Sequence, residues 1–534
     1  MTPTTRRTIL ISLLMAPGLA AGEKPGRPTS PRIIFNCDGD STTLSHFKPP
    51  ITPEQLCRTL DELKGTQVDV FVQCMNRGDD TFSHRTKVGE IYGRNVTEWN
   101  EGAIRKGMKR IAENTWALLD AGHDPFEILA KRARELGMQF WVSMRMNDIH
   151  EDDSTRFYPL RSTFKMKHPE LLIGSPYPDP ARGYPADNFT WAFDFARREV
   201  HNHKLALIAE VCTNYDVDGF ELDFQRGPWY FKKGQELRGM PMMTEFVRRV
   251  RREVNEIGKR KGRALTLAVR VPVTFDACAD KGLDVRTWIR EGLADVITPM
   301  DAGYLDMHAD VRGFVDLAKG TRCAIAGGLE HSTLGYGHAD IAILRAGAMG
   351  FWDQGASSIY LFNYDCHRRK GRHAAYTPQE IEALRQIGSP EIIARRDKRY
   401  VVAVDMSHRT PEDGGTRQLP VVLSRPGEQR AFAFWIGDDL AAARRDGVLA
   451  KIVVAITTRG AKPSQQALRV CLNGHLLGGK GHTYQEGAIV YVDPSSIRRG
   501  RNDLTIEHPE GADKTAKGIR IERIAIDVSY RNAK

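Results

Sequence analysis

Several features that identify common classes of protein are missing from this sequence. It has no Cys-x-x-Cys pair and no His-Glu-x-x-His motif, so it lacks the ligand spacing of common zinc sites. No helix-turn-helix, RRM or zinc-finger pattern accompanies the net charge of +10, which argues against a nucleic-acid partner. The apolar run near the N-terminus is too short for a permanent transmembrane helix. What remains is a chain of 534 residues, 41% hydrophobic and 27% charged, long enough for two or three globular domains.

Cysteine is also scarce, with eight residues in the whole chain. Cys37, Cys74, Cys323 and Cys366 lie inside or at the ends of apolar runs that look like strands. Small buried thiols are common at such positions. We therefore expect free thiols rather than disulfides, although the expected compartment is oxidising.

Residues 1–22 have the pattern of an export signal. Arg6 and Arg7 precede the apolar run ILISLLMA and the small residues GLAAG. The Thr-Arg-Arg start is similar to a twin-arginine signal. We expect a periplasmic or secreted protein that has no membrane association after cleavage of the signal near Ala21 or Gly22. The sequence does not indicate an oligomeric state.

Strand-like runs alternate with helix-length segments across residues 31–390. Helix signals separate the runs; one is the capping box of Thr52 and Gln55, with Pro53 at the first helical position. Strict alternation implies a parallel sheet, and eight such runs predict a closed (β/α)8 TIM barrel. The eight runs are PRIIFNCDGD, VDVFVQCMN, MQFWVSMRMND, VDGFELDF, LTLAVRVP, ADVITPMD, RCAIAGGLE and SSIYLFNYD.

The pattern changes after the barrel. Residues 395–534 contain short β-branched runs separated by turn residues, which predicts a smaller all-β sandwich. The segments ALRVCLNGHLL and RGRNDLTIEH resemble a galactose-binding-like jelly roll. Two interpretations stay open: a carbohydrate-binding module, or a structural cap on the barrel. Trp435 is the aromatic residue to follow, either as a binding surface or as core.

The fourth run, VDGFELDFQRGPWYF at Val217–Phe231, places two carboxylates in an apolar strand. Because side chains alternate between the faces of a strand, Glu221 and Asp223 share one face. Two carboxylates on a buried face are costly unless they are paired or used. This pattern indicates either a buried ion pair or acid–base chemistry at the barrel mouth.

Polar residues follow all eight predicted strands. In TIM barrels, the carboxyl ends of the strands carry the functional groups. A lining this rich in donors and acceptors favours a polyhydroxylated or charged ligand over an apolar one. The predicted substrate-binding residues are Asp38, Arg145, Asn147, Glu221, Arg226, Trp229, Arg270, Tyr304, Asn363 and Tyr364.

Glycoside hydrolysis needs two carboxyl groups that flank the scissile bond. Asp223 ends the fourth predicted strand and Glu330 ends the seventh, while Asp301 at the end of the sixth is the alternative second group. Glu221 lies one inward position deeper, where we expect it to pair with Arg270 on the fifth strand.

The segment WAFDFARREVHNHKLALIAEVCTNYDVDGFELDFQR, within this eight-strand frame, resembles the family-10-like glycosyl hydrolases of bacteria. The resemblance covers Pro31–Asp365 and implies a secreted barrel enzyme that acts on polysaccharides, with Asp223 in a functional role. The largest clan of barrel glycosidases has an Asn-Glu pair where this chain has Leu222-Asp223. We therefore predict Asp223 as acid/base and Glu330 as nucleophile, with exchange of the two roles left open.

The predicted function is that of a secreted glycoside hydrolase with an oligo- or polysaccharide substrate and no cofactor. One alternative is a non-catalytic carbohydrate-binding barrel, because a fold does not fix a function. Another is a metal-dependent barrel enzyme. Its candidate ligands are Asp38, Asp223, His331 and Asp365.

Overall fold

The computed structural model describes most of the chain, in two parts. The predicted signal at residues 1–22 and the predicted site residues Asp301 and Tyr304 lie outside the described residues. Those described are 30–38, 43–76, 78, 80–97, 99, 103–149, 161–174, 191–227, 229–300, 305–333, 336–402, 418–459, 468–477, 481–484, 487–508 and 518–531.

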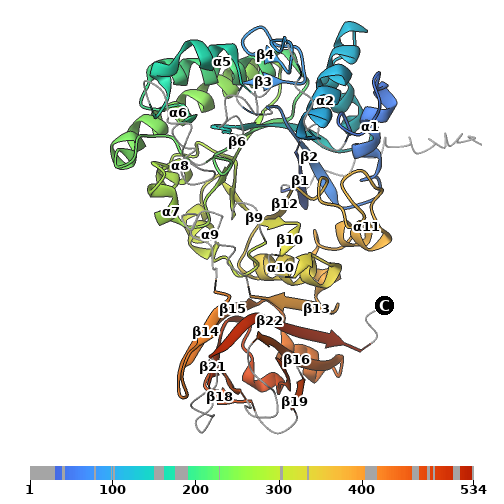
Figure 1. Cartoon of the computed structure of the whole chain (residues 1–534), viewed down its shortest axis with the longest axis vertical. Coiled ribbons are helices and arrows are strands. Elements are labelled where there is room, and N and C mark those ends of the chain that lie inside the picture. The colour runs from blue at the N-terminus through green and yellow to red at the C-terminus, as the bar shows by residue number, and fades with distance from the viewer. Residues whose placement is uncertain are drawn as a thin grey trace, which may run out of the picture.

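A closed barrel of eight parallel strands forms the first part, which confirms the predicted fold class (Figure 1). Each strand pairs with the next one in the chain, and the last closes the ring by pairing with the first. The strands are β1 (Ile33–Cys37), β2 (Val68–Cys74), β5 (Gln139–Arg145), β6 (Gly219–Asp223), β7 (Thr266–Val271), β8 (Val296–Pro299), β9 (Ala324–Glu330) and β12 (Ser358–Phe362).

Helices connect the strands and cover the outside of the barrel (Figure 1). The predicted capping box at Thr52 and Gln55 is present at the start of the first helix, with Pro53 in its first turn. The helices of the barrel are α1 (Pro53–Asp61), α2 (Ala103–Asp120), α3 (Pro125–Glu135), α4 (Thr163–Lys167), α5 (Arg198–Asn214), α6 (Glu236–Arg260), α7 (Phe275–Ala279), α8 (Val285–Arg290), α9 (Arg312–Ala318), α10 (Ile341–Asp353) and α11 (Pro378–Leu384). Two short pairs, β3 (Thr81–Phe82) with β4 (Glu90–Ile91) and β10 (Ser332–Thr333) with β11 (Gly337–His338), lie in the connections.

Alternation along the strands separates two cores. Phe220 and Leu222 point outward into the large core between the barrel and its helices. Side chains such as Val70, Trp141 and Tyr360 point inward and form a second cluster in the barrel interior. The interior is therefore filled, as in other barrels of this size, and its polar groups gather toward the carboxyl ends of the strands.

After α12 (Pro390–Ile393), the chain forms a β domain of two antiparallel sheets, which lies below the barrel in Figure 1. It carries one helix, α13 (Leu440–Arg445). One sheet holds β13 (Lys398–Val401), β22 (Ile519–Tyr530), β16 (Leu449–Arg459), β20 (Gly487–Tyr491), β19 (Gly481–Tyr484) and β14 (Val421–Leu423). The other holds β15 (Gln429–Ile436), β21 (Gly500–Glu507), β17 (Arg469–Leu472) and β18 (His475–Leu476).

Trp435 belongs to the interface between the two parts and is only 8% exposed. Its indole N–H donates to Oδ2 of Asp353 at the end of α10 (2.8 Å), and its backbone N–H donates to Nδ1 of His308 (3.0 Å). The guanidinium of Arg312 covers its ring at 4.4 Å. Trp435 thus belongs to the buried contact between the two parts and is not an exposed binding surface.

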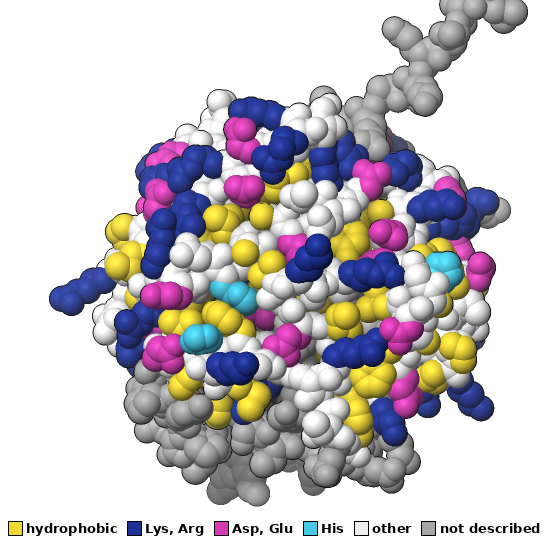
Figure 2. Space-filling view, turned by 90° about the horizontal axis from the view of Figure 1, so that it is seen from above, with side chains coloured by type: hydrophobic (Ala, Val, Ile, Leu, Met, Phe, Trp, Pro, Cys, Tyr) yellow, Lys and Arg dark blue, Asp and Glu magenta, His cyan; other side chains and the backbone are white. Residues whose placement is uncertain are grey.

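The surface shows no concentration of a single charge on the face drawn in Figure 2, where Lys and Arg side chains are interspersed with Asp and Glu. Among the described residues, no helix has both the length and the apolar character needed to cross a membrane. The eight cysteines are free thiols, six of them buried.

Candidate active site

Asp223 and Arg270 form a buried ion pair at the carboxyl end of the barrel interior. The register of β6 and β7 places them side by side. Nε of Arg270 donates to Oδ1 of Asp223 (3.0 Å) and a terminal nitrogen donates to Oδ2 (2.8 Å). The backbone N–H groups of Gln225 and Arg226 also donate to Oδ1 (2.9 and 3.3 Å). These donors satisfy both oxygens of the Asp223 carboxylate.

Glu221 has different partners from the expected one. Its Oε1 accepts hydrogen bonds from Nδ2 of Asn36 (3.1 Å) and from the hydroxyl of Tyr360 (3.0 Å), while Arg270 makes its ion pair with Asp223. Burial, together with the charge of Asp223, raises the pKa of Glu221 to about 7. The two carboxyl groups of β6 therefore differ: Asp223 has Arg270 as its ion-pair partner, whereas Glu221 has hydrogen bonds from Asn36 and Tyr360 and a raised pKa.

A cleft of about 460 Å³ opens at the carboxyl ends of β1, β6, β9 and β12. This is the end at which TIM barrels bind their substrates. Its described lining residues are Asp38, Arg226, Glu330, His331, Gly337, His338, Asn363, Cys366, His367 and Arg372. Four of them, Asp38, Arg226, Glu330 and Asn363, are predicted site residues. The structure brings these four together from four different strand ends.

Glu330, the last residue of β9, lines this cleft although the residue is only 1% exposed. Neither of its carboxylate oxygens accepts a hydrogen bond from a described residue. Nδ1 of His331 lies 2.5 Å from Oε1, an ion-pair distance without the alignment of a hydrogen bond. A buried carboxylate without hydrogen-bond donors is costly, and such groups concentrate at functional sites.

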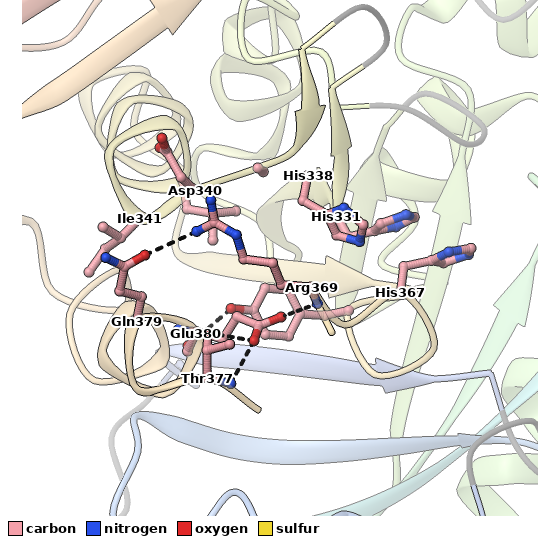
Figure 3. A pocket seen from close by; sticks show the side chains of 12 residues that line it. His331, His338, Asp340, Ile341, His367, Arg369, Thr377, Gln379 and Glu380 are labelled. Carbon is pink, nitrogen blue, oxygen red and sulfur yellow. Dashed lines mark hydrogen bonds between the residues drawn. The ribbon is translucent and has the colours of Figure 1, made fainter. Parts of the chain in front are cut away.

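Three histidines surround the Glu330 side of the cleft. The rings of His331 and His367 stack with centroids 3.7 Å apart and planes 3° apart, and His338 lies 6.0 Å from His331. The same three side chains also line a smaller pocket next to the cleft, which is bounded by Thr377 and Glu380, and Figure 3 shows them grouped at one side of it. Burial and the neighbouring His331 lower the pKa of His367 to about 4, so His367 is neutral at pH 7.

A second group of charges lies around Asp38, after β1. Arg145 at the end of β5 pairs with Asp38 and also with Asp148, at 3.1 Å. Asp365, after β12, accepts a hydrogen bond from the thiol of Cys37 (3.1 Å). Burial and the charge of Asp38 raise the pKa of Asp365 to about 6. Arg145 thus compensates the charge of the one carboxylate, Asp38, that lines the cleft together with Glu330.

Asn147 and Trp229 hold the rim of the barrel together. The side-chain amide of Asn147 donates to the carbonyls of Phe193 (2.9 Å) and Trp229 (2.5 Å), and its oxygen accepts from the backbone of Phe193 (2.9 Å). Gly227 passes so close that a Cβ atom there would lie 2.2 Å from the carbonyl oxygen of Asn147, and its φ of +67° also favours glycine. The substrate-binding role predicted for Asn147 and Trp229 stays a prediction.

Tyr364 is directed away from the cleft. Its hydroxyl donates to the carbonyl of Glu380 (3.0 Å), and its ring packs edge-on against Phe35 in the outer core. Asn363, beside it in the chain, does line the cleft and has a positive φ of 57°.

Some residues of the cleft were not among the sequence predictions. His367 and Arg372 come from the segment HRRKGRH, which follows the last strand after the short stretch of residues 363–366. The signal was a concentration of basic residues shortly after a strand end. The metal-dependent alternative has no support within the described part of the chain, where no group of three or more potential ligands is arranged to hold a metal ion.

No protein-family model matches the chain, and no curated protein matches it, so the resemblance to the family-10-like hydrolases is not supported. Glycoside hydrolases are found among the similar solved structures. One is the α-L-fucosidase isoenzyme 2 from Paenibacillus thiaminolyticus, at 12% identity and a TM-score of 0.40 over 68% of this chain and 50% of that one. Another is the GH36 α-galactosidase AgaB from Geobacillus stearothermophilus, at 13% identity and a TM-score of 0.36 over 89% of this chain and 55% of that one. A third is the α-L-fucosidase from Vibrio sp. strain EJY3, at 10% identity and a TM-score of 0.38 over 93% of this chain and 96% of that one.

The chain spans about half the length of the first two of these proteins. Similarity at this level does not transfer a substrate or a reaction to this chain.

Proposed function

We propose that this protein is a glycoside hydrolase that uses two carboxyl groups at the carboxyl ends of its barrel strands, Glu330, which lines the cleft, and the buried Asp223. The observation that carries the proposal is Glu330: a buried carboxyl group that lines the cleft and has no hydrogen-bond donor among the described residues. A ligand hydroxyl or glycosidic oxygen supplies the missing partner. Polar groups from four strand ends around it suit a substrate rich in hydroxyl groups.

The surroundings of the two carboxyl groups favour an exchange of the roles first predicted. Asp223, whose two oxygens accept hydrogen bonds from the guanidinium of Arg270, suits the nucleophile or the base that activates water. Oδ2 of Asp223 accepts one of the hydrogen bonds described and keeps a lone pair for this role. This leaves Glu330, the other predicted carboxyl group, as the proposed proton donor to the leaving oxygen.

Asp38 is the rival for the second carboxyl group, since it lines the cleft directly whereas the Asp223 side chain is only 2% exposed. In the proposed arrangement, Asp38 binds substrate hydroxyls and Asp223 lies at the floor of the cleft. Arg226 lines the cleft, and its backbone N–H donates to the carboxylate of Asp223 (3.3 Å). Asp223 is therefore in direct contact with a residue of the cleft lining.

The experiment is a hydrolysis assay on a panel of polysaccharides, with wild type, Asp223→Asn and Asp38→Asn, each checked for folding by circular dichroism. We expect wild type to release reducing ends, Asp223→Asn to lose at least about 1000-fold in kcat, and Asp38→Asn to change mainly KM. The configuration of the first product then reports whether the carboxyl groups lie about 5–5.5 Å or about 6.5–9.5 Å apart. Full activity of Asp223→Asn would remove it from the mechanism. Glycan binding without turnover by wild type would favour the non-catalytic alternative.

We also propose that residues 1–22 direct the protein to the periplasm or beyond. The support is the charge and hydropathy pattern of that segment alone. Mass spectrometry of the mature N-terminus from the native host checks this, with cleavage near Ala21 or Gly22 expected and an intact Met1 contradicting it.

A further inference from the structure

Two arginines, Arg226 and Arg372, provide the positive charge of the cleft lining, which also holds the two carboxyl groups of Asp38 and Glu330. Asp38 already has a cation of its own, because Arg145 pairs with it. Among the described lining residues there is no Trp, Tyr or Phe that would bind an uncharged sugar ring by its face. This composition suits recognition by charge more than recognition by apolar contact.

Arg372 is positioned to bind an anion. It lies in the loop after β12 and is exposed, and its Nε donates to the carbonyl oxygen of Cys366 (3.3 Å). Its two terminal nitrogens have no hydrogen bond or ion pair with any described residue. A guanidinium anchored through Nε presents its two terminal nitrogens as a fork, which matches the two oxygens of a carboxylate or a sulfate.

Arg226 adds charge on the opposite side of the mouth. It follows β6, the fourth strand of the ring, whereas Arg372 follows β12, the eighth, so the two loops face each other across the barrel. Glu330, at the end of the seventh strand, lines the same cleft. His367, which stacks on His331 next to Glu330, is neutral at pH 7, so the arginines provide the positive charge there.

We propose that the substrate of this cleft is an anionic glycan, with a carboxylate or sulfate group bound by Arg372 on the sugar next to the scissile bond. This inference rests on the proposed function and adds its substrate class. The shared chemistry is a planar or tetrahedral oxyanion on a sugar ring. Uronic acids and sulfate esters are its two sources.

The test compares Arg372→Gln with Arg369→Gln in the same loop. Arg369 is exposed and carries the same charge, but it lies outside the cleft, where its guanidinium donates to Gln379 (3.1 Å) (Figure 3). The substrates are a polyuronide, the same polymer after chemical reduction of its carboxylates, and a sulfated polysaccharide. Hydrolysis of each is followed as KM and kcat.

We expect Arg372→Gln to raise KM about tenfold or more on one anionic polymer, with Arg369→Gln close to wild type. On the polyuronide with reduced carboxylates, wild type and Arg372→Gln should have the same KM. Added salt should raise the KM of wild type on the anionic polymers. A loss confined to the polyuronide identifies a carboxylate, and a loss confined to the sulfated polymer identifies a sulfate. Equal hydrolysis of charged and neutral polymers, unaffected by Arg372→Gln, would overturn the inference and leave the hydrolase proposal standing.

Binding measurements separate this inference from the hydrolase proposal. Calorimetric titration of Glu330→Gln with uronic-acid and sulfated oligosaccharides should show binding that Glu330→Gln/Arg372→Gln loses. If no glycan is hydrolysed by wild type but this difference in binding is present, the hydrolase proposal fails and anion recognition stands. Absence of binding of every anionic oligosaccharide overturns the inference directly.

Discussion

At the scale of single residues, the ion pair of Asp223 and Arg270 is the most constrained feature of the barrel interior. Both side chains are almost completely buried, and Arg270 also stacks on the ring of Phe362 at 3.9 Å. Removing one partner of a buried pair leaves an uncompensated charge in a medium that solvates it poorly. Asp223 and Arg270 therefore each require the other for the stability of the barrel interior.

We therefore expect Arg270→Met to destabilise the barrel by about 3–5 kcal/mol. The control is Arg248→Met, which removes an equally bidentate pair with Glu291 (2.7 and 2.6 Å) from an exposed position. Exposed pairs contribute up to about 1 kcal/mol, so this control should change the denaturation midpoint little. Urea denaturation followed by tryptophan fluorescence measures the free energy of unfolding of both variants. Equal effects of the two variants would contradict the assignment of a buried pair.

The raised pKa of Glu221 leads to a prediction about how stability depends on pH. Its pKa in the folded protein is raised to about 7, so the folded state holds this proton more tightly than the unfolded state does. Glu221 therefore reduces stability progressively as the pH rises from its ordinary pKa toward 7. Glu221→Gln should remove this loss, so its melting temperature relative to wild type should be higher at pH 8 than at pH 5. A constant difference across this range, measured by differential scanning calorimetry, would show that Glu221 is not held near neutral.

The sequence indicated that Glu221 and Asp223 face the barrel interior, because alternation along a strand decides the face. The prediction that Glu221 pairs with Arg270 was wrong, since Asp223 makes this ion pair. The choice of partner depends on the register between β6 and β7, which places Arg270 beside Asp223 and Ala268 beside Glu221. Register comes from the packing of the whole ring, so the pattern of one strand cannot supply it.

At the scale of elements, the loop after β3 carries a buried histidine with an unusual environment. His84 is 1% exposed, stacks on Phe126 of α3 at 4.2 Å, and has no hydrogen bond to either ring nitrogen among the described residues. Burial lowers its pKa to about 3. The loop can therefore pack against α3 only while His84 is neutral.

This environment makes the packing of that loop sensitive to acid. The unfolded state binds the proton of His84 near pH 6.5 and the folded state only near 3, so stability is lost as the pH falls between these values. His84→Phe keeps an aromatic ring on Phe126 and should lose less stability than wild type between pH 7 and pH 4. Thermal denaturation at the two pH values tests this. An identical acid sensitivity of variant and wild type would contradict a neutral buried His84.

The helices were predictable where local chemistry marks their ends. Thr52, Gln55 and Pro53 form the expected capping box because these contacts involve neighbours in the sequence. The position of His84 was not predictable, because its partner Phe126 lies in another element. Likewise, the grouping of His331 and His367 needed the closed ring, which brings the ends of β9 and β12 together.

At the scale of the whole molecule, the β domain is fixed to the barrel by α10 and by Tyr336, which precedes it in the chain. Besides Trp435, Tyr336 in the barrel donates from its hydroxyl to the carbonyl of Ile524 (2.8 Å), and the backbone N–H of Ile524 donates to the same hydroxyl (2.8 Å). Arg499 pairs with Asp353 at 2.5 Å. These contacts tie both sheets of the β domain to the barrel.

Trp435→Ala should therefore loosen the connection between the domains. Truncation of a buried aromatic side chain costs about 3–5 kcal/mol, and here the cost falls on the interface. We expect limited proteolysis to cleave between residues 385 and 420 faster than in wild type. Tyr491→Ala is the control, because Tyr491 is an exposed aromatic residue of the same domain (47%). Unchanged proteolysis of Trp435→Ala would show that this contact does not hold the domains together.

The central claim is that Glu330 is a catalytic carboxyl group, and Glu330→Gln tests it most directly. Its turnover and its glycan binding are measured beside wild type and Glu291→Gln, a matched change at an exposed site away from the cleft. We predict that Glu330→Gln loses at least about 1000-fold in kcat while it still binds glycan, and that Glu291→Gln behaves like wild type. Wild-type turnover in Glu330→Gln would contradict the account.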